Sequence, residues 1–391
     1  MQIPPELKPF IAQLRAQRPE LKAVSDEQLM ELLQRAMAEH AQQQAAPAAP
    51  PDDAELERMS AAELGDLGER MLEQGQWPAA EPVLLRALAK AEQEGDVNIQ
   101  ISATGLLGRL CKRRGDFAEA HGLLQQALAL AERLGDRRLQ GAIFDQIGST
   151  HQMQSQYPQA IAHYRKSLEI HEALGDEQGM AAGYGNLGSV YLQQGDLDRA
   201  IKMHEKALAL DRKLGNERGA AEDYGNLGTV YFQQGRLDRA AEMHRKSLAI
   251  EERLGLEAGA ANSYGSLGNV YRSQGDLDRA IAMYEKAVAI FERIGDDPHA
   301  AAAYGNLAIC YEQKGAVARA LELYGNSLAI LERIGDRHNA AHIYFNLGTL
   351  YRDKMGDANE ARANLERAKA LYEQVGDAPN AQKAARALLE V

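Results

Sequence analysis

Carboxamide side chains recur at a fixed interval along this chain. Asn186 and Asn226 occupy the same place in two copies of a Tyr-Gly-Asn-Leu-Gly sequence, 40 residues apart. The column contains Asn186, Asn226, Asn306, Asn346 and Gln146, and Ser266 interrupts it. A carboxamide both donates and accepts hydrogen bonds, so it can pair with the N–H and C=O groups of one peptide unit. The column therefore indicates a ladder that contacts an extended peptide, and amides that tie neighbouring helices together are the alternative.

A second set of polar side chains stands near this column and varies between repeats. Arg109, Lys112 and Arg113 are three and four residues apart, so in a helix they share one face. The residues expected to form the peptide-binding groove are Asn186, Asn226, Asn306, Asn346, Gln146, Arg109, Lys112, Arg113, Asn269, Arg272 and Arg352. The cations among them favour an acidic peptide. Scattered arginines that face solvent are the alternative, and the sequence does not choose between the two.

Other polar motifs do not form a catalytic constellation. Residues 183–188 match the dinucleotide pattern G-x-G-x-x-G, but they lie within an expected helix and lack the preceding strand that such a site needs. His338 and His342 have the i, i+4 spacing of a zinc pair, without a predictable third ligand. No Ser/His/Asp order, P-loop or paired carboxylates stand out. We therefore expect no enzyme activity, no catalytic residue, no cofactor and no metal.

A repeat positions all these residues. Its small-residue column, eighth in a unit numbered from Ala181, is Gly68, Gly108, Gly148, Gly188, Gly228, Gly268, Ala308 and Gly348. Eight units with two helical stretches each predict a solenoid, in which every unit buries its apolar face against its neighbours. The expected fold is all-α: a right-handed α-α superhelix of eight helix-turn-helix repeats over residues 56–378, followed by a C-terminal capping helix at 379–391. Glycines such as Gly215 are expected to end the second helices.

The spacing of the constant residues resembles a known repeat family. Leu187, Gly188, Tyr191, Ala200, His204 and Ala207 stand where the tetratricopeptide repeat has its signature residues, with Tyr184 in the usual tryptophan place. The 40-residue unit, with YGNLG at its head and LGD at its end, looks most like the LGN/Pins scaffolds and their bacterial relatives. This resemblance implies an inner groove that holds extended peptides, with asparagines facing it.

The N-terminal part of the chain differs from the repeats. Residues 1–40 carry apolar residues at helical spacing and predict a small helical module. Residues 41–55 are rich in Pro, Ala and Gln and predict a linker. A tethered helical module beside an open groove indicates, as an alternative, that the module docks into the groove of its own or a neighbouring molecule.

Composition limits the partners. The formal net charge of −12 and pI near 5.4 argue against nucleic acid, whose phosphates need a basic face. The chain has no long apolar run and no charged-then-apolar leader, so we expect a soluble cytoplasmic protein without membrane contact. Cys111 and Cys310 fall in distant repeats, which predicts reduced core thiols.

The sequence thus predicts a non-enzymatic scaffold or adaptor that binds an extended segment of a partner protein or peptide. Two alternatives stay open. One is a self-assembling or autoinhibited scaffold, and hence a homo-oligomer, in which the N-terminal helices occupy the groove. The other is a regulatory subunit of a separate enzyme.

Overall fold

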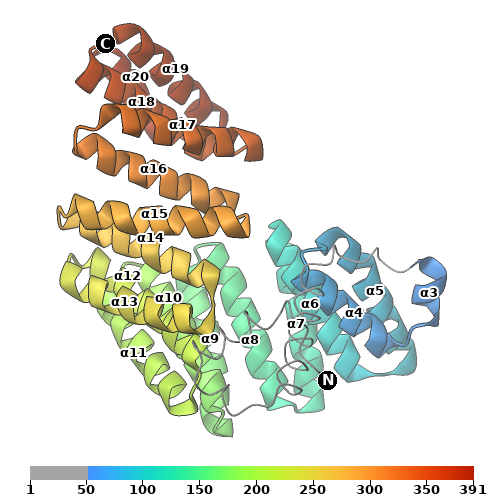
Figure 1. The fold of residues 1–391 in the computed structure, drawn as a ribbon. Helices are drawn as coiled ribbons and strands as arrows, with labels where there is room; N and C mark the ends of the chain where they lie inside the picture. The colour runs from blue at the N-terminus through green and yellow to red at the C-terminus, as the bar shows by residue number, and fades with distance from the viewer. Residues whose placement is uncertain (1–51) are drawn as a thin grey trace, which may run out of the picture. The chain divides into compact units, whose positions relative to one another are not determined.

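The computed structural model describes residues 52–391, so the expected N-terminal module lies outside the described residues (Figure 1). The helices divide after Asp116 into two units, which are treated separately below. The described part of the first unit contains α3 (Asp53–Arg58), α4 (Ala61–Glu73), α5 (Trp77–Glu94) and α6 (Val97–Arg114). Helix α3 begins inside the expected linker, because Asp52 caps it by accepting a hydrogen bond from the Glu55 amide.

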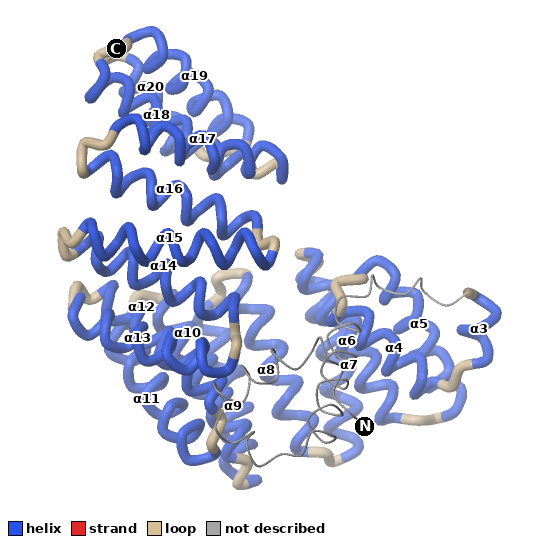
Figure 2. The backbone as a smooth tube through the Cα atoms, viewed as in Figure 1, coloured by secondary structure: helices blue, strands red, loops and turns tan. Residues whose placement is uncertain are grey.

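The second unit is an unbroken succession of helices (Figure 2). Each helix packs mainly against the one before it and the one after it. The helices are α7 (Phe117–Leu134), α8 (Arg137–Met153), α9 (Tyr157–Leu174), α10 (Glu177–Gln193), α11 (Leu197–Leu214), α12 (Glu217–Gln233), α13 (Leu237–Leu254), α14 (Glu257–Ser273), α15 (Leu277–Ile294), α16 (Asp297–Gln313), α17 (Val317–Ile334), α18 (Arg337–Leu350), α19 (Ala358–Gln374) and α20 (Ala378–Leu388).

The all-helical prediction is confirmed. Residues 52–391 contain no strand. In chain order α4 and α5 form a helix pair in the first unit, and six pairs from α8–α9 to α18–α19 follow α7 in the second unit before α20. None of the helices in this range is both long and apolar enough to cross a membrane.

The Leu-Gly-Asp or Leu-Gly-Asn sequence between successive repeats ends one helix and starts the next. Gly215 adopts the left-handed conformation, with φ of 70°, after the last residue of α11. Asn216 then caps α12, because its side chain accepts a hydrogen bond from the amide of Gly219. The expected helix ends are confirmed, since glycines at the equivalent places also have positive φ.

The eighth-position glycines let the two helices of a pair approach closely. A Cβ atom on Gly228 would lie 2.7 Å from the His244 ring, and one on Gly268 would lie 2.7 Å from the Tyr284 ring. His244 and Tyr284 are buried at the same place of the second helix, position 24. A larger residue at the eighth position would push this ring, and the helix that carries it, away.

The last pair contains one extra residue, and the helix absorbs it locally. Residues Tyr351–Met355 form a π-helical turn between α18 and Gly356. A π-turn holds one residue more than an α-turn, so the pairing of α18 with α19 survives the insertion.

Ser155 provides a test of the turn chemistry. It is the one non-glycine residue with positive φ, 57°, among the described residues, and Gly195 occupies the equivalent turn with φ of 80°. Because a side chain disfavours this conformation by about 1 kcal/mol, we expect Ser155→Gly to raise the free energy of unfolding by about that amount. Gly195→Ser should lower it similarly in urea titrations. Equal stability of Ser155→Gly and wild type would contradict this explanation.

Candidate functional site

The first helices of the pairs leave one face uncovered in the second unit. In α12 this face carries Glu222, Gly225, Asn226, Thr229 and Phe232, all exposed or half-buried. These are the second, fifth, sixth, ninth and twelfth positions of the unit, spaced three or four residues apart along the helix. We call the surface formed by these positions in α8, α10, α12, α14, α16 and α18 the first-helix face.

Three amides of the column are unpaired on this face. Asn226, Asn306 and Asn346 are half-buried. Their side chains make no hydrogen bond to another described residue, and their polar atoms are not among the buried, unpartnered ones. Their carboxamides therefore remain open to solvent or to a ligand.

Asn186 is different, because it lies against Asp145 of α8. Burial raises the pKa of Asp145 to about 6, and the nearby polar groups of Ser167 and Asn186 together with the charge of His171 partly oppose that rise. Asp145 stands where the later repeats have Gly185, Gly225, Gly265 and Gly305. Asn186 thus has a carboxylate of the preceding first helix beside it, whereas glycine gives the other asparagines no polar side chain at the equivalent place. Gln146 also differs from them, since its Oε1 atom is buried without a hydrogen-bond partner.

Two of the four fifth-position glycines, Gly185 and Gly265, are not explained by packing, whereas a Cβ atom on Gly305 would lie 3.0 Å from Ile343. A Cβ atom on Gly185 or Gly265 would meet no neighbouring atom within 4 Å. By contrast, a Cβ atom on Gly188 at the eighth position would lie 2.6 Å from His204. Glycine in a helix interior costs about 1 kcal/mol relative to alanine. Gly185 and Gly265 therefore keep the first-helix face clear at an energetic cost that helix packing does not require.

Most of the expected groove cations have partners. In the first unit, the Arg113 guanidinium lies 3.7 Å from the centre of the Trp77 ring, and Arg109 lies 4.0 Å from Glu69. Burial and the nearby charge of Arg109 lower the pKa of Lys112, which also has interactions of its own. The three expected cations of that helix lie in a different unit from the asparagine column, so the structure describes two separate sets.

The remaining expected residues lie in the second unit. Arg352 pairs with Asp353 at 2.7 Å and with Glu390 at 2.5 Å. Asn269 accepts a hydrogen bond of 2.7 Å from the Tyr284 hydroxyl. Arg272 is half-buried, its Nε atom has no hydrogen-bond partner, and no ion pair joins it to a described carboxylate.

The histidines do not assemble a metal site within residues 52–391. His338 and His342 face each other with their Nε2 atoms 3.2 Å apart, and the Tyr372 hydroxyl lies 2.7 Å from Nδ1 of His342. In this range no group of three or more His, Cys, Asp or Glu side chains is placed to hold an ion.

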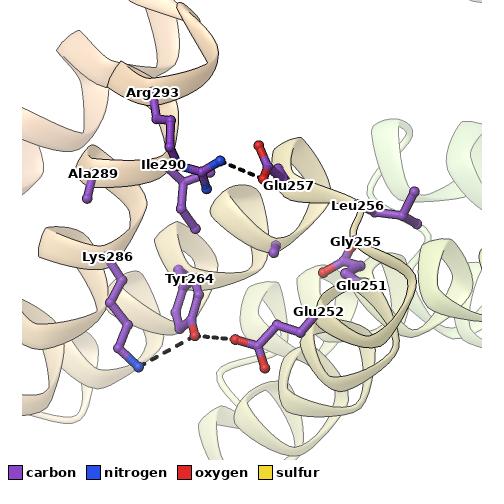
Figure 3. A pocket seen from close by; sticks show the side chains of 11 residues that line it. Glu251, Glu252, Gly255, Leu256, Glu257, Tyr264, Lys286, Ala289, Ile290 and Arg293 are labelled. Carbon is purple, nitrogen blue, oxygen red and sulfur yellow. Dashed lines mark hydrogen bonds and ion pairs between the residues drawn. The ribbon is translucent and has the colours of Figure 1, made fainter. Parts of the chain in front are cut away.

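Pockets lie at the junctions between repeats, a feature that the sequence interpretation missed. One of about 510 Å³ is formed where the end of α13 meets the start of α14 and the neighbouring α15 (Figure 3). In it the Tyr264 hydroxyl donates to Glu252, and Arg293 pairs with Glu257 at 2.5 Å (Figure 3). An equivalent pocket of about 310 Å³ lies at Tyr344. The sequence signal for these pockets is a glutamate 12 residues before the fourth-position tyrosine, because the two side chains bond to each other across the junction. These side chains already bond to one another, so the pockets offer few free polar groups.

Known proteins share this architecture. A family model described as tetratricopeptide repeat matches residues 58–133, 99–173, 139–213, 179–253, 220–293, 259–333 and 299–374. No curated protein sequence matches the chain.

Solved structures that resemble the chain include two Rap proteins. The apo form of RapI is 15% identical, with a TM-score of 0.63 over 84% of this chain and 96% of that one. A Rap protein complexed with Competence and Sporulation Factor is 17% identical, with a TM-score of 0.54 and the same coverages of 84% and 96%.

A third structure is a signal transduction ATPase with a tetratricopeptide repeat sensor, from Pyrococcus horikoshii. It is 19% identical, with a TM-score of 0.64 over 81% of this chain and 49% of that one. At these identities the likeness to the three structures concerns the fold alone.

Buried histidine at position 24 predicts a pH-dependent stability. Burial lowers the pKa of His244 to about 4, and its Nδ1 atom has no partner among the described residues. Because the unfolded chain binds the proton with a pKa of about 6.5, His244 costs no stability above pH 6.5 and lowers stability as the pH falls from 6.5 to 4. We expect His244→Tyr to remove roughly 2 kcal/mol of the loss between pH 7.5 and 5, measured by urea unfolding.

A matched control uses the tyrosine at the same place. Tyr284→His should add a loss of stability of similar size over the same pH range, because both rings pack on glycine at 2.7 Å. Parallel pH profiles for His244→Tyr and wild type would show that this histidine does not control the dependence.

Proposed function

Because the chain belongs to the tetratricopeptide repeat family, we propose that it is a non-enzymatic interaction scaffold whose first-helix face binds an extended segment of another protein. The observation that carries this proposal is that unbonded amides stand on the same face as glycines that have open space beside them. Asn226 stands beside the fifth-position column that contains Gly185, where an added Cβ would meet nothing. A ligand backbone can approach there and form hydrogen bonds with the amide.

The spacing of the repeats suits an extended ligand. Packed helices lie about 10 Å apart, and an extended strand rises about 3.3 Å per residue. Adjacent first helices would therefore meet the backbone about every third residue. Asn306 and Asn346 have this spacing, and Ser266 interrupts it between Asn226 and Asn306. A carboxamide bonds to the ligand's backbone and does not contact the ligand's side chains, so such a ladder provides affinity for any extended sequence. Selectivity between ligands must come from the positions that vary between repeats.

The narrower interpretations keep the status of predictions. The likeness to the LGN/Pins group rests on the YGNLG and LGD sequences, and the cytoplasmic location rests on composition. The alternatives of a self-assembling or autoinhibited scaffold depend on residues 1–40, which lie outside the described residues. A regulatory role toward a separate enzyme has no described residue to support it. We therefore propose the peptide-binding scaffold ahead of these alternatives.

The amide ladder is tested by changing Asn226, Asn306 and Asn346 together to alanine. If each amide contributes about 1 kcal/mol, affinity for a partner isolated by affinity capture should fall on the order of 100-fold in calorimetric titration. Asn186→Ala is the matched control, because that amide lies against Asp145, and it should change affinity much less. A triple variant that binds the partner as tightly as wild type would contradict the ladder.

The open glycines give a second test with opposite effects on folding and binding. Gly185→Ala and Gly265→Ala should each raise the free energy of unfolding by about 0.5–1 kcal/mol, because alanine is the better helix former and meets no neighbour within 4 Å. The same methyl groups should weaken partner binding by obstructing the ligand backbone. Thermal unfolding and binding are measured on the same samples. Unchanged binding in both variants would leave these glycines without a role in ligand contact.

A further inference from the structure

The twelfth position of the first-helix face changes its chemistry along the second unit. In chain order it carries Gln152, Leu192, Phe232, Arg272, Glu312 and Arg352. Leu192 and Phe232 are half-buried and pack against the edge of the core. Two adjacent repeats therefore offer apolar surface where the flanking repeats offer polar groups.

The ring at position 24 explains where the face is polar. The Tyr164 hydroxyl donates to Gln152 at 2.8 Å, and the Tyr324 hydroxyl donates to Glu312 at 2.9 Å. The second helices that follow Leu192 and Phe232 carry His204 and His244 instead, which have no hydroxyl that reaches the face. Without such a hydroxyl, an apolar residue at the twelfth position deprives no tyrosine O–H of its acceptor. In these two repeats the apolar residue of the first helix therefore goes together with the histidine of the second helix.

Other hydroxyls on this stretch are already used. Ser189 donates to the carbonyl of Gly185 at 3.0 Å, and Thr229 donates to the carbonyl of Gly225 at 3.1 Å. Met153, next to Gln152 on α8, has 54% of its surface exposed and continues the apolar character. Asn226, on the same helix as Phe232, has an unpaired amide, which suits a peptide backbone.

Arg272 ends the apolar stretch, and no ion pair joins this arginine to a described carboxylate. The charge of Arg272 partly opposes the rise in pKa that burial causes at Tyr284, Cys310 and Tyr324. The Arg352 guanidinium at the same position of α18–α19 has two carboxylate partners. In a chain of net charge −12, a half-buried arginine without a carboxylate partner suits a carboxylate supplied from outside.

We propose that the segment bound on the first-helix face carries two apolar side chains three residues apart, which contact Leu192 and Phe232, and a carboxylate three residues further, which pairs with Arg272. This inference rests on the proposed function. The spacing follows from helices about 10 Å apart and a rise of about 3.3 Å per residue. The cations in the sequence favour a generally acidic ligand. The ligand inferred here is instead an apolar segment with one carboxylate at its end.

The test uses fluorescein-labelled synthetic peptides and the full chain in fluorescence anisotropy. The probe peptides contain Leu-Ser-Ser-Leu-Ser-Ser-Glu or the reverse order in a Gly/Ser background, and the controls replace Glu with Lys or both Leu with Ser. We expect wild type to bind one order of the Leu/Glu peptide at least 10-fold more tightly than either control. Arg272→Glu should reverse the preference between Glu and Lys, which a merely unfolded variant would not do.

The outcomes separate this inference from the proposed function. Equal binding of the Glu and Lys peptides, or no binding of either order, overturns the selectivity assigned to Arg272. If peptides bind without this preference and still lose affinity in the triple asparagine variant, the scaffold function stands and the inference fails. If binding shows the preference and does not depend on the asparagines, the amide ladder of the proposed function fails instead. Circular dichroism checks the folding of each variant.

Discussion

The contact between a second-helix ring and a first-helix glycine is the constraint on which the structure depends. The rings of Tyr164, His204, His244 and Tyr284 pack so closely on Gly148, Gly188, Gly228 and Gly268 that an added Cβ would lie between 2.6 and 2.9 Å away. This contact sets the distance between the helices of a pair. It also fixes the rotation of the first helix, and so determines which of its positions remain uncovered.

The same contact links the core to the chemistry of the exposed face. A tyrosine at position 24 sends its hydroxyl out to Gln152, Asn269 or Glu312, and each of these residues becomes partly committed to the fold. A histidine has no hydroxyl that reaches the face, and the twelfth position of the paired first helix is apolar. His204 instead lies 3.2 Å from Asp223 of α12, the first helix of the next pair. Whether position 24 is tyrosine or histidine thus affects which side chains a bound segment would contact on the first-helix face.

The sequence predicts the repeat well because its signals are local and periodic. Gly215 and Asn216 end and start helices through their own backbone and side-chain preferences, and the period then assigns every other boundary. The roles of individual glycines are harder to predict. Gly185 and Gly188 look alike in sequence, yet one has open space beside it and the other contacts His204. Only the arrangement of the neighbouring helix distinguishes them.

The candidate site was likewise only partly predictable. The asparagine column follows from the period, but the exception of Asn186 depends on Asp145 replacing glycine in the preceding repeat, which is a tertiary contact. The cations were the least predictable part, because a charge has a partner or lacks one only in three dimensions. Trp77 stacks under Arg113, and Arg352 is paired twice, whereas Arg272 has no carboxylate partner.

Photo-cross-linking tests the central claim, that the first-helix face holds the partner, most directly. A benzophenone amino acid at Glu222 would stand exposed on that face, and one at Glu205 would stand exposed on the second helix α11. After irradiation of the complex with a captured partner, we expect cross-linked partner from position 222 and none from position 205. Cross-linking from position 205 alone would contradict the account.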